Sequence, residues 1–451
     1  MPAHETRRLA EFAVHLAFDD LPAEIVRSAR NTIIDGVACC VFGSRFPWSR
    51  NIIDYVESMY GPGGTSSILA PHRTGFHASG AALINGALAH AFELDAGTRK
   101  GVGAHPFGTV FTAALPVAQS LGASGRELIT AFVAGSEVML RIGKATGRSN
   151  EHRGFHAPGT TGPFGAAIAC AHLYKLDLEQ TLNAIGIAGS LASGLRQFSK
   201  SPSGGMVKRL HFGRAAEGGV LAAGLAARGF DGPHDILEGE AGFLKVFCDH
   251  FDLDQLTLGL DSGVFHMREI SMKTFGTHGS TQGPLHALLD VFSRRRVTPA
   301  DIKRVSVEVS QESLDHHAGR EPLDLMQAQY SIPFCIALAC VRDIRDPRSI
   351  REDALFDPAV SSMLAKVDVR CGAFADKRTC RVVVELWCGE TLEAFLQESA
   401  SEWKPASDAS VFAKFEMLMR DVPADRAQLL LEHLQRLEMQ ADLEFFSLLR
   451  P

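Results

Sequence analysis

The sequence lacks the patterns that mark several common kinds of protein. Its nine cysteines are scattered and form no CxxC pair, which argues against a structural zinc site or an iron–sulfur cluster. No apolar run reaches the roughly 18 residues that span a membrane, and the opening residues MPAHETRRLAEF lack the apolar core of a signal peptide. The net charge is −7, whereas nucleic-acid binding needs a basic surface. We therefore expect a cytoplasmic protein, with free thiols, that binds neither membranes nor nucleic acid.

Familiar catalytic signatures are missing as well. The chain has no HExxH zinc motif and no GxSxG nucleophile elbow, and GVGAHPFG does not follow a strand as a dinucleotide fingerprint would. His152 and His156 have the HxxxH spacing of a metal pair, but Gly154 between them weakens the helix that such a pair requires. These motifs therefore argue against a histidine metal pair and against a dinucleotide site.

The character of the sequence changes near residue 265. Earlier residues read as helices, several of them rich in Ala and Gly, which indicates close helix crossings because glycine in a helix is otherwise unfavourable. Later stretches such as RVSVEVS, VDVRCGAF and RVVVELWCGETLEAFL alternate like half-buried strands, and MQAQYSIPFCIALACVRDI reads as a helix interrupted by Pro333. We predict a mainly α protein: a large all-helical domain built from both chain ends (1–265 and 403–451) and a smaller inserted α+β lid domain (266–402).

Titratable side chains gather among glycines in four stretches. These stretches are HAFELDAGTRKGVGAHPFG with Glu93, Asp95, Thr98, Arg99, Lys100 and His105; EHRGFHAPGTTGPFG with His156; RQFSKSPSGGMVKRLHFGRAA with Lys208 and Arg209; and SMKTFGTHGSTQGPLHALLD with Lys273 and His278. An acidic chain that concentrates cations in Gly-rich loops is typical of an anion-binding protein. In the last stretch, Gly276 and Gly279 predict a turn that feeds a helix around QGPLHALLD.

Each stretch also has a purely structural interpretation. Glu93 and Asp95 could simply end a helix, and the cations of residues 196–216 could form a solvated face. Lys273 and His278 taken alone would be a surface lysine and a histidine with satisfied hydrogen bonds. His211 and His286 have apolar neighbours, which favours a place in the core or behind the site.

Six segments, in this order, resemble the MmgE/PrpD family of 2-methylcitrate dehydratases, cis-aconitate decarboxylases and iminodisuccinate epimerases. They are AHAFELD with the following HPFG, GFHAPGTTGPFGAA, VKRLHFGRAAEGG, LEGEAGF, KTFGTH and AQYSIPF, and together they run over nearly the whole chain. The resemblance implies a helical domain with a smaller α+β lid, an active site between the domains, and a homodimer that uses no cofactor. It implies a small di- or tricarboxylate as the substrate. By motif, the implied catalytic residues are Asp95, His105, His156, Lys208, Lys273 and His278, and the expected substrate-binding residues are Glu93, Thr98, Arg209 and Tyr330.

The sequence departs from the family pattern at three places. Glu93-Leu94-Asp95-Ala96 stands where many members have Asp-Phe-Asp-Asp, and Val207-Lys208-Arg209 replaces Thr-Lys-Pro and adds a cation. Phe334 occupies a position that is often tyrosine, with Tyr330 one turn earlier. These differences bear on the substrate more than on the family.

The reactions of this family make or break a bond at a carbon next to a carboxylate, where the developing charge needs cations or hydrogen bonds. We expect Lys208, Lys273 and Arg209 to hold carboxylates, and His105 and His156 to exchange protons, since histidine titrates near neutrality. Asp95 would orient an imidazole or act as the base. We favour dehydration, as in 2-methylcitrate dehydratase. Decarboxylation of the cis-aconitate type, epimerisation of a dicarboxylate, and a non-catalytic carboxylate-binding or scaffold role remain alternatives.

Overall fold

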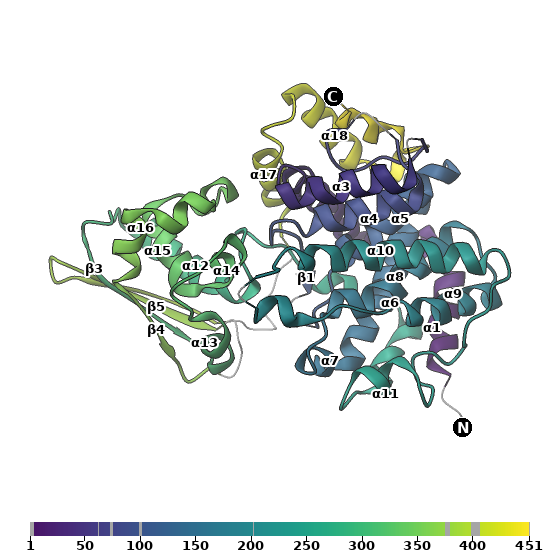
Figure 1. Cartoon of the computed structure of the whole chain (residues 1–451), viewed down its shortest axis with the longest axis horizontal. Coiled ribbons are helices and arrows are strands. Elements are labelled where there is room, and N and C mark those ends of the chain that lie inside the picture. Colours follow the sequence, from purple (N-terminus) through teal and green to yellow (C-terminus); the bar gives the residue numbers. More distant parts are fainter. Residues whose placement is uncertain are drawn as a thin grey trace. The chain divides into compact units, whose positions relative to one another are not determined.

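The computed structural model of the chain describes residues 4–61, 63–72, 75–98, 102–201, 203–374, 379–397 and 406–450. The chain divides into two compact units, one of Met1–Met272 with Pro405–Pro451 and the other of Lys273–Lys404 (Figure 1). The domain boundaries after residues 265 and 402 remain a prediction, and residue 402 lies outside the described residues.

The first unit consists mainly of helices. Its α-helices are α1 (Glu5–His15), α2 (Ala23–Gly43), α3 (Pro47–Tyr60), α4 (Ala78–Ala89), α5 (Thr112–Leu121), α6 (Gly125–Thr146), α7 (Ser149–His152), α8 (Ala157–Leu173), α9 (Leu178–Ser190), α10 (Val207–Ala226), α11 (Phe243–Phe247), α17 (Asp408–Leu418) and α18 (Ala424–Gln435). The prediction of an all-helical domain was wrong in one detail, because Gly97–Thr98 (β1) pairs antiparallel with Ile270–Ser271 (β2). Two-residue strands are too short to show an alternating pattern in the sequence.

Local hydrogen bonds explain where two of these helices begin. The Ser124 hydroxyl accepts a hydrogen bond from the Glu127 backbone N–H, and the Glu127 carboxylate accepts one from the Ser124 N–H, which closes a capping box at the start of α6. Asp177 and Gln180 form the same arrangement ahead of α9. The sequence contains both partners of each box at the required spacing, so both helix starts can be recognised from it.

Glycines let helix α10 approach its neighbours closely. A Cβ on Gly213 would lie 2.3 Å from the Leu83 carbonyl oxygen of α4, and a Cβ on Gly219 would lie 2.2 Å from the Ala166 Cβ of α8. Any larger residue would push the helices apart, since a buried crossing has no room to adjust. The crossings fix the position of α10, whose first turns carry Lys208, Arg209 and His211.

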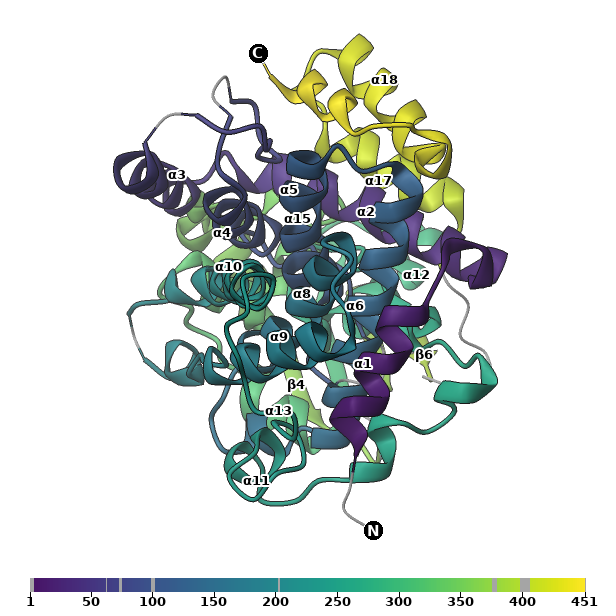
Figure 2. The same ribbon diagram turned by 90° about the vertical axis from the view of Figure 1, so that its right-hand side faces the viewer.

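The two ends of the chain meet within the first unit. Helix α17 packs against α2, and α18 also contacts α2, so the yellow C-terminal helices lie beside the purple N-terminal segment (Figures 1 and 2). Of the helices that the structure describes, none combines the length and the apolar character needed to cross a membrane.

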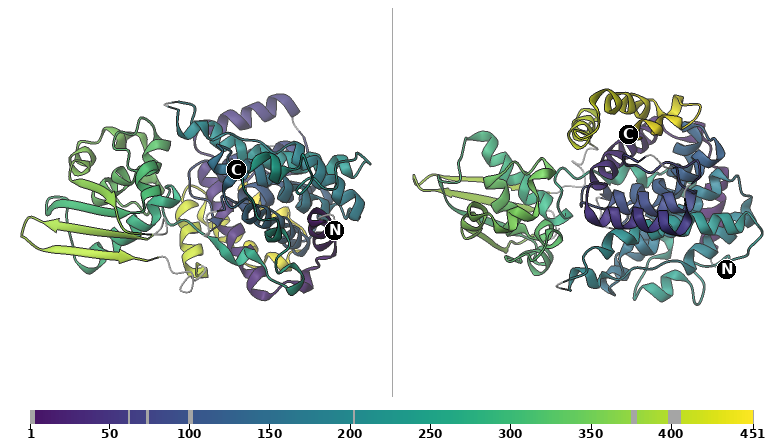
Figure 3. Two further views of the ribbon diagram at one scale, coloured as in Figure 1. Left: turned by 90° about the horizontal axis from the view of Figure 1, so that it is seen from below. Right: turned by 45° about the horizontal axis from the view of Figure 1, so that its top comes forward.

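The second unit combines helices with one sheet. Its elements are α12 (Gly279–Arg294), β3 (Ile302–Val309), α13 (Gln311–His317), α14 (Leu325–Tyr330), α15 (Ile332–Val341), α16 (Pro358–Leu364), β4 (Val367–Cys371), β5 (Cys380–Leu386) and β6 (Thr391–Leu396). The strand order is β4-β3-β5-β6, with β3 and β4 parallel and the other pairs antiparallel. Alternate residues of β5 are buried, and α12 packs against β5 and β6, so the helices cover one side of the sheet (Figure 3, left).

The predicted helix interruption at Pro333 was misplaced. The break falls at Ser331, whose side chain accepts a hydrogen bond from the Phe334 N–H and caps the new helix α15. Pro333 then stands in the first turn of α15, where its missing N–H costs no hydrogen bond. The strand predictions were confirmed, and RVVVELWCGETLEAFL forms a hairpin of β5 and β6. Residues 375–378, which precede this hairpin, lie outside the described residues.

Candidate functional site

The turn that follows α4 carries two buried carboxylates. Glu93 is 3% exposed and Asp95 is completely buried. Glu93 has a φ of 54°, a left-handed conformation that is uncommon for a residue with a side chain. Surrounding contacts must hold such a backbone, and conformations of this kind gather at functional sites.

Asp95 accepts hydrogen bonds from two histidines. The Nδ1 atom of His90 lies 2.7 Å from Oδ1 of Asp95, and the Nδ1 atom of His105 lies 2.7 Å from Oδ2. Burial alone would raise the pKa of Asp95, but the two imidazoles outweigh burial and hold this pKa well below its ordinary value. The ionised carboxylate makes both Nδ1 atoms donors. The Nε2 atom of His105 is thereby the one that can exchange a proton with a substrate.

His90 is a site residue that the sequence interpretation missed. Burial, and then the positive charge of Lys208, lower its pKa well below the ordinary value, so the ring is neutral. The ring stacks on Phe212 with centroids 3.9 Å apart, and its Nε2 atom lies 3.4 Å from Oε1 of Glu93. His90 belongs to the AHAFELD segment, so its place in that motif was the available signal.

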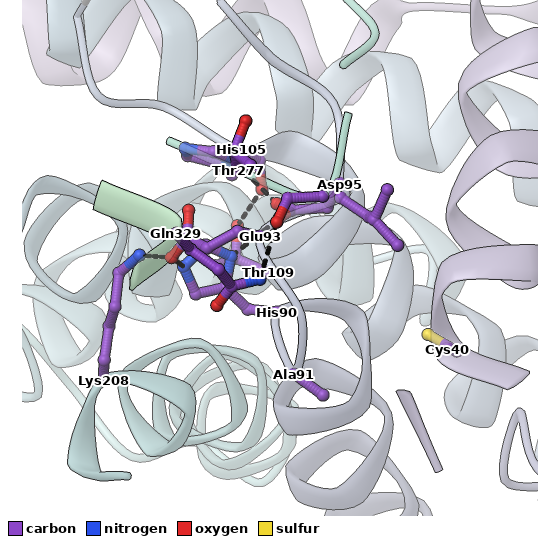
Figure 4. Close-up of polar contacts among 12 residues, drawn as sticks. Cys40, His90, Ala91, Glu93, Asp95, His105, Thr109, Lys208, Thr277 and Gln329 are labelled. Atoms are coloured by element: carbon purple, nitrogen blue, oxygen red, sulfur yellow. Dashed lines mark hydrogen bonds and ion pairs between the residues drawn. The ribbon is translucent and has the colours of Figure 1, made fainter. Parts of the chain in front are cut away.

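A buried cation lies beside His90 and Glu93. Lys208, in the first turn of α10, forms an ion pair with Glu93, and both side chains are almost fully buried (Figure 4). Arg209 takes a different direction. Its guanidinium donates a hydrogen bond of 2.6 Å to the Gly205 carbonyl and lies 4.8 Å from the ring centroid of Trp48. Stacking of this kind holds a guanidinium in one orientation.

His156 pairs with another histidine. The residue occupies the N-cap position of α8. Its Nδ1 atom lies 3.0 Å from Nδ1 of His211, so one nitrogen must donate and the other accept. Burial, and then His211, lower the pKa of His156 well below its ordinary value. Burial, and then Lys208, lower the pKa of His211 to about 4. His211 therefore contacts a candidate catalytic residue, and the tautomers of the two rings depend on each other. His152, in contrast, is exposed at the end of α7.

Thr98 lies in β1 and is 7% exposed. The preceding residue, Gly97, leaves room for the His105 ring, because a Cβ there would lie 3.1 Å from Cε1 of that ring. Arg99 and Lys100 lie outside the described residues. The first unit thus brings Glu93, Asp95, His105, His156 and Lys208 into one neighbourhood around His90 and Phe212: Phe212 contacts the rings of His90, His105 and His156.

The second unit carries the other three candidates. His278 directly precedes α12 and caps it, since its Nδ1 atom accepts a hydrogen bond of 3.3 Å from the Ser280 N–H. The predicted turn that feeds a helix is therefore confirmed. The His278 ring stacks on Tyr330 at 4.4 Å and on His317 at 4.3 Å. Lys273 opens this unit, and Phe334, at the position that is often tyrosine, is buried in α15. His317 was not foreseen, because nothing in its sequence neighbourhood indicates that it stacks on His278.

Three of these side chains could also hold a metal ion. The nearest donor atoms of His90, Asp95 and His105 all lie within 4.8 Å of one another. Two imidazoles and a carboxylate suit a borderline metal such as zinc. A metal at the two Nδ1 atoms would have to displace the protons that now bind Asp95, so protons and metal compete for the same place.

Comparison with known proteins places these residues in a family. Residues 7–256 match the MmgE/PrpD N-terminal domain, and residues 275–438 match the MmgE/PrpD C-terminal domain. A protein from Aspergillus terreus named cis-aconitate decarboxylase is 28% identical over 446 residues, which are 92% of this chain and 89% of that protein. Another of that name, from Aspergillus terreus strain NIH 2624, is 30% identical over 358 residues, covering 74% of this chain and 71% of the relative.

A more distant relative is the Homo sapiens protein named cis-aconitate decarboxylase. It is 25% identical over 370 residues, covering 79% of this chain and 75% of that protein. The two matched domains follow one another in the chain and together account for most of it. The chain therefore belongs to the MmgE/PrpD family.

Proposed function

We propose that this protein is a lyase that acts on a small tricarboxylate, and that it decarboxylates cis-aconitate or a close analogue. The names of the relatives support this substrate, and the site supports the chemistry. Dehydration, which the sequence interpretation favoured, becomes the second candidate. It would make the protein a carbon–oxygen lyase, whereas decarboxylation breaks a carbon–carbon bond.

The observation that carries the proposal is the ionised Asp95 held between two imidazoles. Decarboxylation breaks the bond between a carbon and its carboxylate, releases carbon dioxide, and leaves an electron pair that takes up one proton. His105 binds the buried Asp95 carboxylate through Nδ1, and this bond holds the ring so that Nε2 is the atom that delivers the proton. The cation of Lys208 lies nearby in its ion pair with Glu93, and a carboxylate of the substrate would share this cation with Glu93.

Dehydration would need two proton transfers, since a base removes a proton from carbon and an acid protonates the departing hydroxyl. His105 can serve as one group, and the neutral His156 as the other. That second histidine, within 6.3 Å of His90 between ring centroids, is the specific observation that keeps dehydration as a candidate.

The proposal extends to Lys273, His278 and Tyr330 of the second unit on the match of motifs alone, with residues 266–402 acting as a lid. If this is right, Lys273→Ala and His278→Gln will each lower kcat. A homodimer and a cytoplasmic location remain predictions of the sequence.

The test is incubation of the purified protein with cis-aconitate, 2-methylcitrate and citrate in deuterium oxide. Carbon dioxide release from cis-aconitate, with one deuterium bound to carbon in the product, supports decarboxylation. Water loss from a hydroxy acid without carbon dioxide supports the second candidate. His105→Gln should abolish the activity, whereas Arg27→Gln, on the exposed side of α2, should keep it. No turnover of any of the three compounds would contradict the proposal.

A further inference from the structure

A buried lysine near the end of the chain contacts the turn that carries the two carboxylates. The ammonium nitrogen of Lys414, in α17, donates a hydrogen bond of 2.8 Å to the carbonyl oxygen of Leu94, although the two residues are 320 positions apart. Leu94 stands between Glu93 and Asp95. The contact therefore acts on the backbone that joins two candidate site residues.

The charge of Lys414 is held in place by an acid on another helix. Its ammonium nitrogen lies 2.6 Å from Oδ1 of Asp35, in α2, and Asp35 is fully buried. Burial opposes the charge on Lys414, but the attraction of Asp35 outweighs it and the pKa of Lys414 is raised. The lysine remains a cation with at least two acceptors, Asp35 and the Leu94 carbonyl.

The turn needs this kind of support. Glu93 has a left-handed backbone, and the Leu94 side chain is 1% exposed, so neither residue can relax into solvent. A fixed carbonyl of Leu94 sets the direction of the peptide that follows it. That direction places the Asp95 carboxylate between the Nδ1 atoms of His90 and His105, both at 2.7 Å.

We propose that Lys414 is a positioning residue, which fixes the Leu94 carbonyl and thereby aims Asp95 at the two imidazoles. Its effect on catalysis rests on the proposed function, but its effect on the two hydrogen bonds does not. The rival explanation is that Lys414 and Asp35 only tie α17 to α2.

The same two helices offer a matched control. Arg27 of α2 and Asp408 of α17 form an ion pair of 2.9 Å on the surface, where the Arg27 side chain is 57% exposed. Arg27→Gln removes a tie between α2 and α17 without touching Leu94. Both Arg27→Gln and Lys414→Met would therefore loosen the contact between α2 and α17. Only Lys414→Met would also disturb the turn that carries Leu94.

The measurement is proton NMR of the exchangeable imidazole N–H groups of the whole protein. His90→Gln and His105→Gln each remove one Nδ1–H resonance and so assign the pair. We expect Lys414→Met to shift or remove both resonances and to lower kcat by about tenfold to a hundredfold, the scale of a misplaced catalytic group, with a smaller change in KM. Arg27→Gln should leave both resonances and kcat as they are, and Lys414→Arg should restore part of kcat.

A second variant separates positioning from stability, since Lys414→Met alone leaves the Asp35 carboxylate buried without its cation. The double variant Asp35→Asn with Lys414→Met removes this buried charge. We expect the double variant to unfold cooperatively on heating, as the wild type does, while both imidazole N–H resonances stay displaced. The proposal would be overturned if the Nδ1–H resonances of His90 and His105 were unchanged in the folded double variant. It would also be overturned if Arg27→Gln shifted these resonances as much as Lys414→Met does. If the wild type turns over none of the three substrates, the proposed function fails, and the resonances still decide the role of Lys414.

Discussion

The substitution Asp95→Asn tests the arrangement at the centre of the site. Asparagine keeps the shape of the side chain but removes the charge and replaces one accepting oxygen with an NH2 donor. In the native protein both imidazoles donate to the carboxylate from Nδ1 at 2.7 Å. Beside asparagine, only one of them can keep its proton on Nδ1. The other must face the NH2 group with a bare nitrogen and carry its proton on Nε2.

The structure sets the size of the effect. A hydrogen bond to a buried charged group contributes about 1.5–3 kcal/mol, and removing the carboxylate also removes the cost of burying it. We therefore expect the free energy of unfolding at pH 7 to fall by about 2–3 kcal/mol. If His105 is the ring that changes tautomer, kcat should fall by about 1,000- to 10,000-fold, as expected when an amide replaces a carboxylate that orients a catalytic imidazole.

The loss of stability should depend on pH. The pKa of Asp95 is lower in the folded protein than in the unfolded chain, so its stabilising effect is fully present above the ordinary pKa of an aspartate. This effect disappears as the pH falls through the folded pKa. Urea unfolding of wild type and Asp95→Asn should therefore give curves that differ at pH 7 and approach each other in acid. A stability difference that is the same at pH 7 and in acid would refute the reasoning, and a kcat within about threefold of wild type would show that His90 is the ring that changes tautomer.

Three further predictions concern other contacts of the site. His211 has a pKa of about 4 in the folded protein, below its unfolded value, so its contribution to stability is complete above about pH 6.5 and is lost as the pH falls from about 6.5 to 4. The melting temperature of His211→Phe should therefore fall less steeply over that range than the melting temperature of the wild type. Gly213→Ala should destabilise the protein by about 1–3 kcal/mol in urea unfolding because its Cβ would meet the Leu83 carbonyl, whereas Gly224→Ala in the same helix, whose Cβ would lie 3.8 Å from the Arg228 side chain, should cost less. Added Zn²⁺ should inhibit, because a metal ion held by His90, Asp95 and His105 would take the carboxylate that orients His105, and activity unchanged by Zn²⁺ would contradict a metal site there.

The parts of the fold that sequence could predict depend on residues close together in the chain. Ser124 and Glu127 are three positions apart, so a capping box is visible before any tertiary contact is known. The alternation of β5 is equally local, and so is the turn that leads from Gly276 into the helix capped by His278. The position of Asp95 followed from a motif rather than from its surroundings.

The remaining features depend on contacts between distant segments. His90 is understood only when Phe212 is seen stacked against it, and His211 only when His156 is seen beside it. The sequence around Lys414, VFAKFEML, reads as an ordinary helix, and nothing in it indicates Leu94 as a partner. Pro333 is a local exception, since the Ser331 side chain two positions earlier caps α15 and decides where that helix begins.

The packing of α17 on α2 has a consequence for biosynthesis. The ribosome makes α2 (Ala23–Gly43) early and α17 (Asp408–Leu418) only after the whole of the second unit. Until α17 has been made, the Asp35 carboxylate and the Leu94 carbonyl lack the Lys414 ammonium group that contacts both of them in the full chain. A nascent or truncated chain that ends before residue 406 would hold nearly every helix of the first unit and still lack the cation that completes the turn. If Lys414 has the proposed role, the turn that carries Glu93 and Asp95 reaches its final geometry only after α17 has been made.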